Sequence, residues 1–262
     1  MAEQRRAAAD LARYYDLDTA GEQADLDLYL ALAASAGGPL LELAAGTGRV
    51  ALPLAAAGNA VTAVDRDPHM LARARRTWDE IQSAGRGSGE LETIEAEISG
   101  LHLERRFALV ILALNTLLLL PGREAQRECL QAMARHLAPD GRAVIDVWLP
   151  APEDLGLYDG RLTLEWLRRD EETGEMVAKL FSARHDAALA TARVHTLFDA
   201  WSDATGSMRR LARADDLSFL SAHELLSLAG DAGLDPTVVA QDYSLTSFGT
   251  GSERMVLVCS LL

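Results

Sequence analysis

The residues with the clearest chemical meaning are two glycines and two carboxylates near the start of the chain. Gly46 and Gly48 follow a short apolar run that contains Glu42, and Asp65 ends the next apolar run. Glycines between a strand and a helix let a ligand approach the backbone where a Cβ would collide with it. This arrangement is typical of a loop that binds an adenosine-containing ligand.

Two classes of ligand fit this loop, and Glu42 distinguishes them. Residues 46–51 (GTGRVA) match the fingerprint of dinucleotide-binding loops. A dinucleotide would place its pyrophosphate over the loop, where Glu42 would repel it. S-adenosylmethionine (SAM) would place an ammonium and a sulfonium there, and a carboxylate suits both. Asp65 suits either ligand, because its two oxygens can accept hydrogen bonds from two ribose hydroxyls.

A third carboxylate follows the third apolar run. Glu97 could accept a hydrogen bond from an adenine amino group, and Ile98 beside it could pack on the ring. Glu42, Asp65 and Glu97 come from successive strand ends. Open α/β sheets bind ligands in the crevice at the carboxyl ends of their strands. We therefore expect the three carboxylates to line one crevice.

Apolar runs alternate with helical patterns between residues 39 and 148, and this alternation predicts the elements that position the site. Strands are expected at residues 39–44, 60–65, 91–96, 107–114 and 143–148. Helices are expected at 48–57, 67–81 and 124–137, with a turn at 139–141. The repeated order of strand and helix predicts a doubly wound α/β sheet.

The pattern changes after the fifth strand, where turns separate four strand-like segments. These segments are 161–168, 176–184, 190–201 and 208–214, with hairpin connections expected at 172–174 and 203–206. We expect an antiparallel β-sheet inserted into the α/β domain. A helix from Ser221 to Ala232, with a capping box at Ser221 and Glu224, and strands at 237–243 and 255–261 then complete the α/β domain.

These segments resemble class I SAM-dependent methyltransferases, in the branch that acts on small molecules. Residues 41–50 (LELAAGTGRV) and 61–71 (VTAVDRDPHML) are similar to the first two motifs of that family. Residues 107–117 are similar to its fourth motif and 137–146 to its fifth. Residues 14–18 and 25–29 resemble its lead-in helices, and 217–226 with 232–234 its last helix and strand. The resemblance implies a Rossmann-like sheet of seven strands.

The resemblance also implies a role for each matching position. The positions around the methionine end of SAM are Glu42, Ala44, Gly46 and Gly48. Those at the adenosine are Asp65 for the ribose, Arg66 beside the adenine, and Glu97 with Ile98 at the base. Those beside the amino group and the transferred methyl are Leu114 and Asn115. Arg49, and Tyr15 as part of a lid, complete the predicted cofactor-binding set.

Three positions depart from the family pattern. Ala44 stands where the family usually has its first glycine, and Glu97 where aspartate is commoner. Ala108 stands where an aspartate usually precedes the core of the fourth strand. Alanine at position 44 is expected to be a sterically mild change.

A sulfonium methyl is already activated, so the protein must mainly orient the acceptor and exclude water. An amine acceptor needs positioning, whereas a hydroxyl usually needs a general base. Tyr15, His185 and His195 are the candidate bases, and His195 is expected in an inserted strand that folds over the pocket. The six histidines are scattered, so no metal site is predicted.

Composition argues against several other classes of protein. The chain has 25 basic and 39 acidic residues and a net charge of −14, which disfavours nucleic acid and anionic membranes as partners. Its two cysteines are too few for a disulfide framework, and its polar start leads into no apolar signal region. We expect a cytoplasmic protein with a small-molecule substrate.

The expected organisation has four parts. Residues 1–38 form a helical lid, 39–150 the SAM-binding core, 151–216 an inserted sheet that is a substrate cover or a homodimer interface, and 217–262 the completion of the core. The predicted function is methyl transfer from SAM to a nitrogen or oxygen of a small organic molecule, such as an amino sugar or a specialised metabolite. The alternatives are a peptide or protein N-methyltransferase, a dinucleotide-binding oxidoreductase, and a non-catalytic cofactor-binding module.

Overall fold

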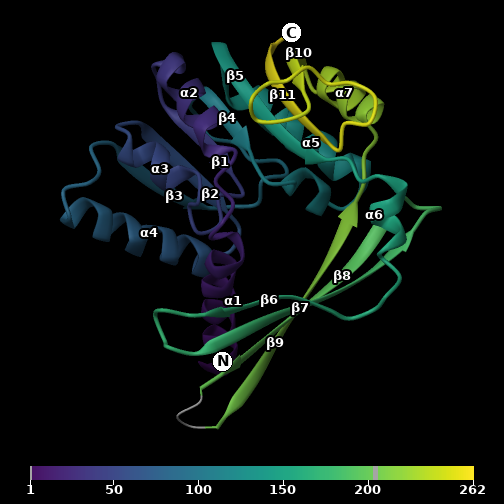
Figure 1. The fold of residues 1–262 in the computed structure, drawn as a ribbon. Helices are drawn as coiled ribbons and strands as arrows, with labels where there is room; N and C mark the ends of the chain where they lie inside the picture. The colour runs from purple at the N-terminus through teal and green to yellow at the C-terminus, as the bar shows by residue number, and fades with distance from the viewer. Residues whose placement is uncertain (1, 203–205) are drawn as a thin grey trace.

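A seven-stranded sheet (sheet A) forms the centre of the computed structural model, which describes residues 2–202 and 206–262 (Figure 1). Its strands are β1 (Leu40–Leu43), β2 (Ala60–Asp65), β3 (Glu90–Glu95), β4 (Phe107–Leu112), β5 (Leu137–Trp148), β10 (Leu234–Ala240) and β11 (Arg254–Leu261). They lie in the order β10-β11-β5-β4-β1-β2-β3, with β11 antiparallel to both of its neighbours. The predicted doubly wound, seven-stranded α/β sheet is confirmed.

Helices cover both faces of sheet A. Those that carry the two large apolar clusters are α2 (Leu26–Ala36), α3 (Ala51–Ala56), α4 (Pro68–Ser83), α5 (Gly122–His136) and α7 (Ala222–Asp231). Residues of α2 and α3 pack in one cluster, and residues of α5 and α7 pack in the other. β4 is buried almost throughout because helices lie over both sides of it, as its continuous apolar sequence predicts.

Two helix starts follow directly from local sequence. The Asp67 side chain accepts a hydrogen bond from the His69 N–H, and Pro68 stands at the first position of α4. Ser221 and Glu224 form the predicted capping box at the start of α7. In both cases the cap satisfies N–H groups that have no partner within the helix, so the sequence signal is local and reliable.

The turn predicted at residues 139–141 is wrong, because these residues lie within β5. Phe107 pairs with Leu137 and Leu109 pairs with Arg142, so four residues of β5 bulge out between two paired positions. Gly141 permits this bulge, since a Cβ there would lie 2.9 Å from the carbonyl oxygen of Phe107. Pairing with β4 on both sides of the bulge overrides the local turn signal.

The insertion forms a separate four-stranded antiparallel sheet (sheet B). Its strands are β6 (Thr163–Arg169), β7 (Met176–Asp186), β8 (Thr191–Trp201) and β9 (Met208–Ser218), in chain order. The inserted sheet after the fifth strand is therefore confirmed, although β9 extends to Ser218. The connection at 172–174 is present, with the Gly174 N–H 2.7 Å from the carbonyl oxygen of Asp170. The connection expected at 203–206 falls mostly on residues 203–205, which lie outside the described residues.

The first helix, α1 (Ala2–Thr19), lies between the core and sheet B (Figure 1). Tyr14 of α1 is fully buried against Val177, Phe198 and Ala200 of sheet B. The short helices α6 (Pro152–Gly156) and η1 (Thr116–Leu119) line the junction with the core. Within the described ranges, no helix is both long and apolar enough to cross a membrane. The later part of α1 thus reaches the loop after β1, where Tyr15 lies against Gly46, while the N-terminus lies at the far end of the helix (Figure 1).

Candidate functional site

The glycine loop is fixed by a carboxylate from the neighbouring strand. The Gly46 N–H donates a hydrogen bond to Asp65 Oδ2 at 2.8 Å, and the Asp67 N–H donates to Oδ1 at 2.8 Å. Asp65 is buried at the carboxyl end of β2. Each carboxylate oxygen has a second lone pair, so Asp65 can hold the loop and still accept from a ligand hydroxyl. The structure thus brings the loop and Asp65 together.

The backbone of the site has an unusual share of left-handed residues. Gly46 and Gly48 have φ values of +57° and +84°, and Ala44 has φ +54°. A left-handed conformation costs a residue with a Cβ about 1–2 kcal/mol, so the expectation that alanine at position 44 is sterically mild is wrong. Leu114 and Asn115, after β4, have φ values of +47° and +60°. Strain of this kind is typical of ligand sites, where surrounding structure holds the backbone in place.

Glu42 is a buried carboxylate with an unused acceptor. Glu42 lies in β1, and only 4% of the residue is exposed. Within the described part of the chain, its Oε2 atom has no hydrogen-bond partner. Burial raises the pKa of the carboxyl to about 8, and the positive charge of Arg49 opposes that shift. An orphaned buried acceptor is costly unless a ligand supplies the missing donor. An ammonium fits this position, whereas a pyrophosphate does not.

Tyr15 of α1 covers the glycine loop. Its Cε1 atom lies 3.6 Å from the point that a Cβ on Gly46 would occupy. Burial raises the pKa of the Tyr15 phenol to about 12, so the hydroxyl keeps its proton at neutral pH. The position therefore suits a cover that excludes water from the loop better than it suits a general base.

Arg49, just after the glycine loop, is hydrogen-bonded to the segment between α1 and α2. Its guanidinium makes two hydrogen bonds to the Asp25 carboxylate, at 2.7 and 2.5 Å, and a third to the carbonyl oxygen of Glu22 at 2.8 Å. Asp25 precedes α2 and is almost fully buried. A bidentate pair of this kind fixes orientation as well as charge. Arg49 thus holds the entry to α2 against the loop while its charge acts on Glu42.

The remaining predicted positions lie along the same edge of sheet A. Arg66 and Glu97 are exposed directly after β2 and shortly after β3, and Ile98 is buried in the core behind them. Asn115 Oδ1 accepts from the Trp148 N–H at 2.5 Å, which ties the loop after β4 to the end of β5. These predicted positions therefore follow successive strand ends along one edge of sheet A.

His195 does not join this group. It is exposed on β8, whereas its neighbours Val194 and Thr196 line a cavity on the inner face of sheet B. Because side chains alternate between the faces of a strand, His195 points to the opposite side. Of the three candidate bases, the structure places only Tyr15 beside the glycine loop and the cavity, since the ring of His185 on β7 packs against Phe219.

The cavity lies between α1 and sheet B and has a volume of about 220 Å³. Tyr15 forms part of its wall, so the cavity adjoins the glycine loop. Aromatic rings from Tyr158, Phe181 and Phe198 also line it. Its charged residues are Asp18, Glu165, Lys179, Arg213 and Asp215. We did not predict these residues from sequence; the one signal available was Lys179, the only lysine in the chain.

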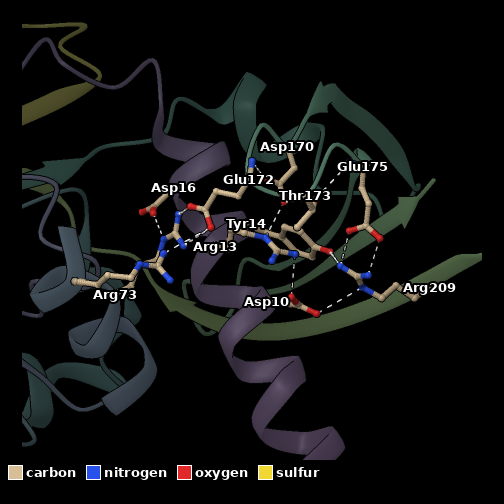
Figure 2. Close-up of polar contacts among 11 residues, drawn as sticks. Asp10, Arg13, Tyr14, Asp16, Arg73, Asp170, Glu172, Thr173, Glu175 and Arg209 are labelled. Atoms are coloured by element: carbon tan, nitrogen blue, oxygen red, sulfur yellow. Dashed lines mark hydrogen bonds and ion pairs between the residues drawn. The ribbon is translucent and has the colours of Figure 1, made fainter. Parts of the chain in front are cut away.

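Ion pairs hold α1 in place beside the cavity (Figure 2). Arg73 of α4 pairs with Asp16 of α1 and with Glu172 in the β6–β7 connection. On the sheet B side, Arg209 donates to the Tyr14 hydroxyl at 2.8 Å and pairs with Glu175. We call the trio Arg73, Asp16 and Glu172 the α1 junction, because it joins the core, α1 and sheet B.

Similarity to known proteins agrees with this geometry. Residues 40–141 match the family model described as a methyltransferase domain. The cypemycin N-terminal methyltransferase of a Streptomyces species is 26% identical over 222 residues, which cover 85% of this chain and 82% of that protein.

Solved structures extend the match to nearly the whole chain. The CcbJ methyltransferase from Streptomyces caelestis has a TM-score of 0.73 and 26% identity, covering 91% of this chain and 90% of that one. The sugar N-methyltransferase KedS8 from Streptoalloteichus sp ATCC 53650 shares the fold, with a TM-score of 0.71, 22% identity, and coverage of 94% and 92%. These similarities identify residues 40–141 as a methyltransferase domain and show that nearly the whole chain has the fold of solved methyltransferases.

Proposed function

We propose that this methyltransferase acts on an amine nitrogen of a small molecule bound between α1 and sheet B. The observation that carries the proposal is the charge of the cavity wall. Three carboxylates line the cavity against two cationic side chains, and Tyr15 joins the cavity to the glycine loop. A wall with excess negative charge attracts a cationic acceptor and disfavours an anionic one.

The size of the cavity supports a small acceptor. A volume of about 220 Å³ lies below the roughly 300–1,000 Å³ of typical ligand pockets. This space suits a compact molecule or a single terminal group. The aromatic side chains in the wall can cover apolar parts of such a molecule, while the charged side chains orient its polar groups.

The predicted cofactor set supports the following assignment. Glu42 would bind the ammonium of SAM, and Asp65 would accept from its ribose hydroxyls. The methionine end would lie against Ala44, Gly46, Gly48 and Arg49, and the adenine against Arg66, Glu97 and Ile98. Leu114 and Asn115 would lie beside the amino group and the methyl. Bound SAM supplies a methyl on a sulfonium, which needs no further activation.

In this proposal the protein contributes orientation and the exclusion of water. Tyr15 and residues 1–38 form the lid, and the inserted sheet, 151–216, covers the acceptor. Residues 39–150 and 217–262 form the binding core. An acceptor that binds as an ammonium must first lose one proton to solvent, which frees its lone pair. The neutral amine, aligned with the sulfur–methyl bond, then needs no strong base, and alignment can supply a large part of the rate. We also place the protein in the cytoplasm, because free buried cysteines are typical of a reducing compartment.

The proposal is tested by turnover with matched acceptors. The full chain is mixed with SAM and with primary amines or with alcohols of the same carbon skeleton, and release of S-adenosylhomocysteine is measured. We expect turnover of amines and none of the matched alcohols. Turnover of alcohols alone would contradict the amine assignment, and binding of SAM without any turnover would favour a non-catalytic module.

A peptide N-terminus is the second candidate acceptor. It is favoured by the similarity to the cypemycin enzyme, which is named as an N-terminal methyltransferase. The same assay distinguishes it when short peptides with free and with acetylated N-termini are included. Preference for free N-termini over small amines would favour the peptide reaction.

A further inference from the structure

Glu165 lies on a β-bulge that turns its side chain into the cavity. Leu164 pairs with Leu180 and Trp166 pairs with Lys179, so Glu165 is an extra residue in β6. In a regular strand the neighbour of Trp166 would point to the opposite face of sheet B. Glu165 instead lines the same cavity as Lys179. Bulges commonly re-aim a side chain next to an active site.

The contacts of Glu165 leave part of its carboxylate available. Lys179 Nζ lies 2.7 Å from Glu165 Oε2, and 2.7 and 2.9 Å from the two oxygens of Asp18. Asp18 also accepts from Trp166 Nε1 at 2.8 Å. Within the described residues, Glu165 receives a hydrogen bond from Lys179 alone, and 37% of its side chain is exposed. Glu165 is therefore the less saturated of the two carboxylates.

The charges of this trio do not balance. One ammonium serves two carboxylates, so Asp18, Glu165 and Lys179 together carry one net negative charge. The other charged residues of the wall, Arg213 and Asp215, pair with each other at 2.6 Å. The uncompensated charge of the cavity therefore lies at the Glu165 end.

The identity of Lys179 supports a positioning role. It is the only lysine in the chain, beside 24 arginines. A lysine ammonium is a compact charge that can direct its N–H groups to three separate oxygens, whereas the arginine fork is planar and larger. Only 14% of the Lys179 side chain is exposed, so its charge is directed to the carboxylates more than to the cavity. Lys179 thus holds Glu165 in place, and its N–H groups are taken up by Glu165 and Asp18.

We propose that Glu165 is the residue that binds the amino group of the acceptor, and that Lys179 and Asp18 position it. The proposal rests on the proposed function, since it names the group in the cavity that would recognise an amine. An ammonium or amine N–H would donate to the available oxygen of Glu165, and charge-assisted hydrogen bonds of this kind are stronger than neutral ones.

Binding of a minimal cationic amine tests this site without knowledge of the natural acceptor. The full chain is saturated with S-adenosylhomocysteine, and binding of methylammonium is followed by ligand-observed NMR, with methanol as the neutral control. We expect saturable binding of methylammonium and none of methanol. In Glu165→Gln the affinity should fall at least tenfold, and in Glu165→Asp it should fall less.

Asp216→Asn is the matched control. Asp216 lies on β9, next to Asp215, but it is exposed and pairs with Arg193 at 2.8 Å. The substitution removes the same charge from sheet B outside the cavity, so methylammonium binding should stay within twofold of the unmodified protein. The affinity for S-adenosylhomocysteine and the unfolding temperature should be unchanged in all of these variants. Lys179→Met leaves Asp18 and Glu165 unpaired, so methylammonium binding should not weaken. The KM of a turned-over acceptor should rise, because Glu165 is no longer held in place, and Lys179→Arg should reverse part of that rise.

Two results would overturn the inference: no binding of methylammonium by the unmodified protein, or equal binding by it and by Glu165→Gln. Failure of the proposed function is a separate result, because it would appear as absence of amine methylation while Glu165-dependent binding persists. If an acceptor is turned over, Glu165→Gln should raise its KM at least tenfold and change kcat less. An unchanged KM would refute the role of Glu165 and leave the methyltransferase activity standing.

Discussion

The Tyr15 ring lies over Gly46, with Cε1 3.6 Å from the point that a Cβ on the glycine would occupy. This contact joins the first helix of the chain to the loop after β1, and Tyr15 also lines the cavity between α1 and sheet B. Two roles of Tyr15 can be tested separately: the ring covers the loop, and the hydroxyl could transfer a proton.

Tyr15→Phe keeps the ring and removes the hydroxyl. Burial holds the Tyr15 pKa near 12, so we expect the hydroxyl to contribute little as a base and kcat to stay within about threefold. Tyr15→Ala removes the cover and should raise the dissociation rate of SAM about tenfold, which corresponds to about 1.4 kcal/mol. Stopped-flow dissociation and steady-state turnover measure the two effects. A large loss of kcat in Tyr15→Phe would instead assign the hydroxyl to catalysis.

SAM binding should release a proton from Glu42 below pH 8. Burial holds the Glu42 pKa at about 8 in the free protein, and the ammonium of the cofactor should lower it. Affinity should therefore rise with pH up to about pH 8 and fall above it, because the α-amino group of free SAM then loses its own proton. Calorimetry in buffers with different ionisation enthalpies counts the protons released. Glu42→Gln provides the baseline, since only the titration of the ligand itself remains; equal proton release in both proteins would contradict the assignment.

The same carboxyl should cost stability at high pH. The pKa of Glu42 is raised from 4.5 in the unfolded reference to about 8 in the folded protein, so the unfolded state loses its proton first. Stability should fall as pH rises from about 4.5 to about 8, and the loss is complete above that range. Glu42→Gln should be more stable than the unmodified protein at pH 8.5 and about equal to it at pH 4.5. Chemical denaturation at the two pH values measures this, and a pH-independent difference would refute it.

Ala44→Gly should stabilise the protein. A left-handed alanine costs about 1–2 kcal/mol, and the greater entropy of glycine in the unfolded chain offsets part of the gain. We expect a net stabilisation of about 0.5–1 kcal/mol, with unchanged affinity for SAM. Gly46→Ala is the reverse control, because it places a Cβ at φ +57° and should destabilise. A loss of stability in Ala44→Gly would show that the alanine methyl makes a contact worth more than the strain.

The α1 junction should control how fast SAM exchanges. Arg73→Met breaks the pairs with Asp16 and Glu172, so α1 should open more often and SAM should dissociate several times faster. Added salt should speed dissociation from the unmodified protein more than from Arg73→Met, because the variant has lost the pairs that salt screens. Arg76→Met is the control, since Arg76 is exposed and lies 3.6 Å from Glu172. Equal SAM dissociation rates in Arg73→Met and Arg76→Met would show that the α1 junction does not control opening of the lid.

Much of the cofactor site is predictable from the sequence. Gly46, Gly48 and Asp65 stand out because a strand, a glycine turn and a helix leave local signals, and because parallel strands end at one edge of a sheet. The sequence shows Glu42 as a carboxylate within the apolar run at residues 39–44. It does not show that Glu42 is buried, since burial depends on the helices that pack over β1. The conformation of Ala44 was missed for the same reason: φ is imposed by the surrounding fold and not by the alanine itself.

The order of elements, the glycine loop and the inserted antiparallel sheet can be predicted from the amino-acid sequence, because hydrophobic periodicity and turn residues act over short distances. Which side chains meet in the cavity between α1 and sheet B depends on the packed fold. Asp18 and Lys179 are far apart in the chain, the bulge at Glu165 depends on pairing with β7, and the outward position of His195 depends on which face of sheet B meets α1. These relationships come from packing between distant segments, which no local pattern records.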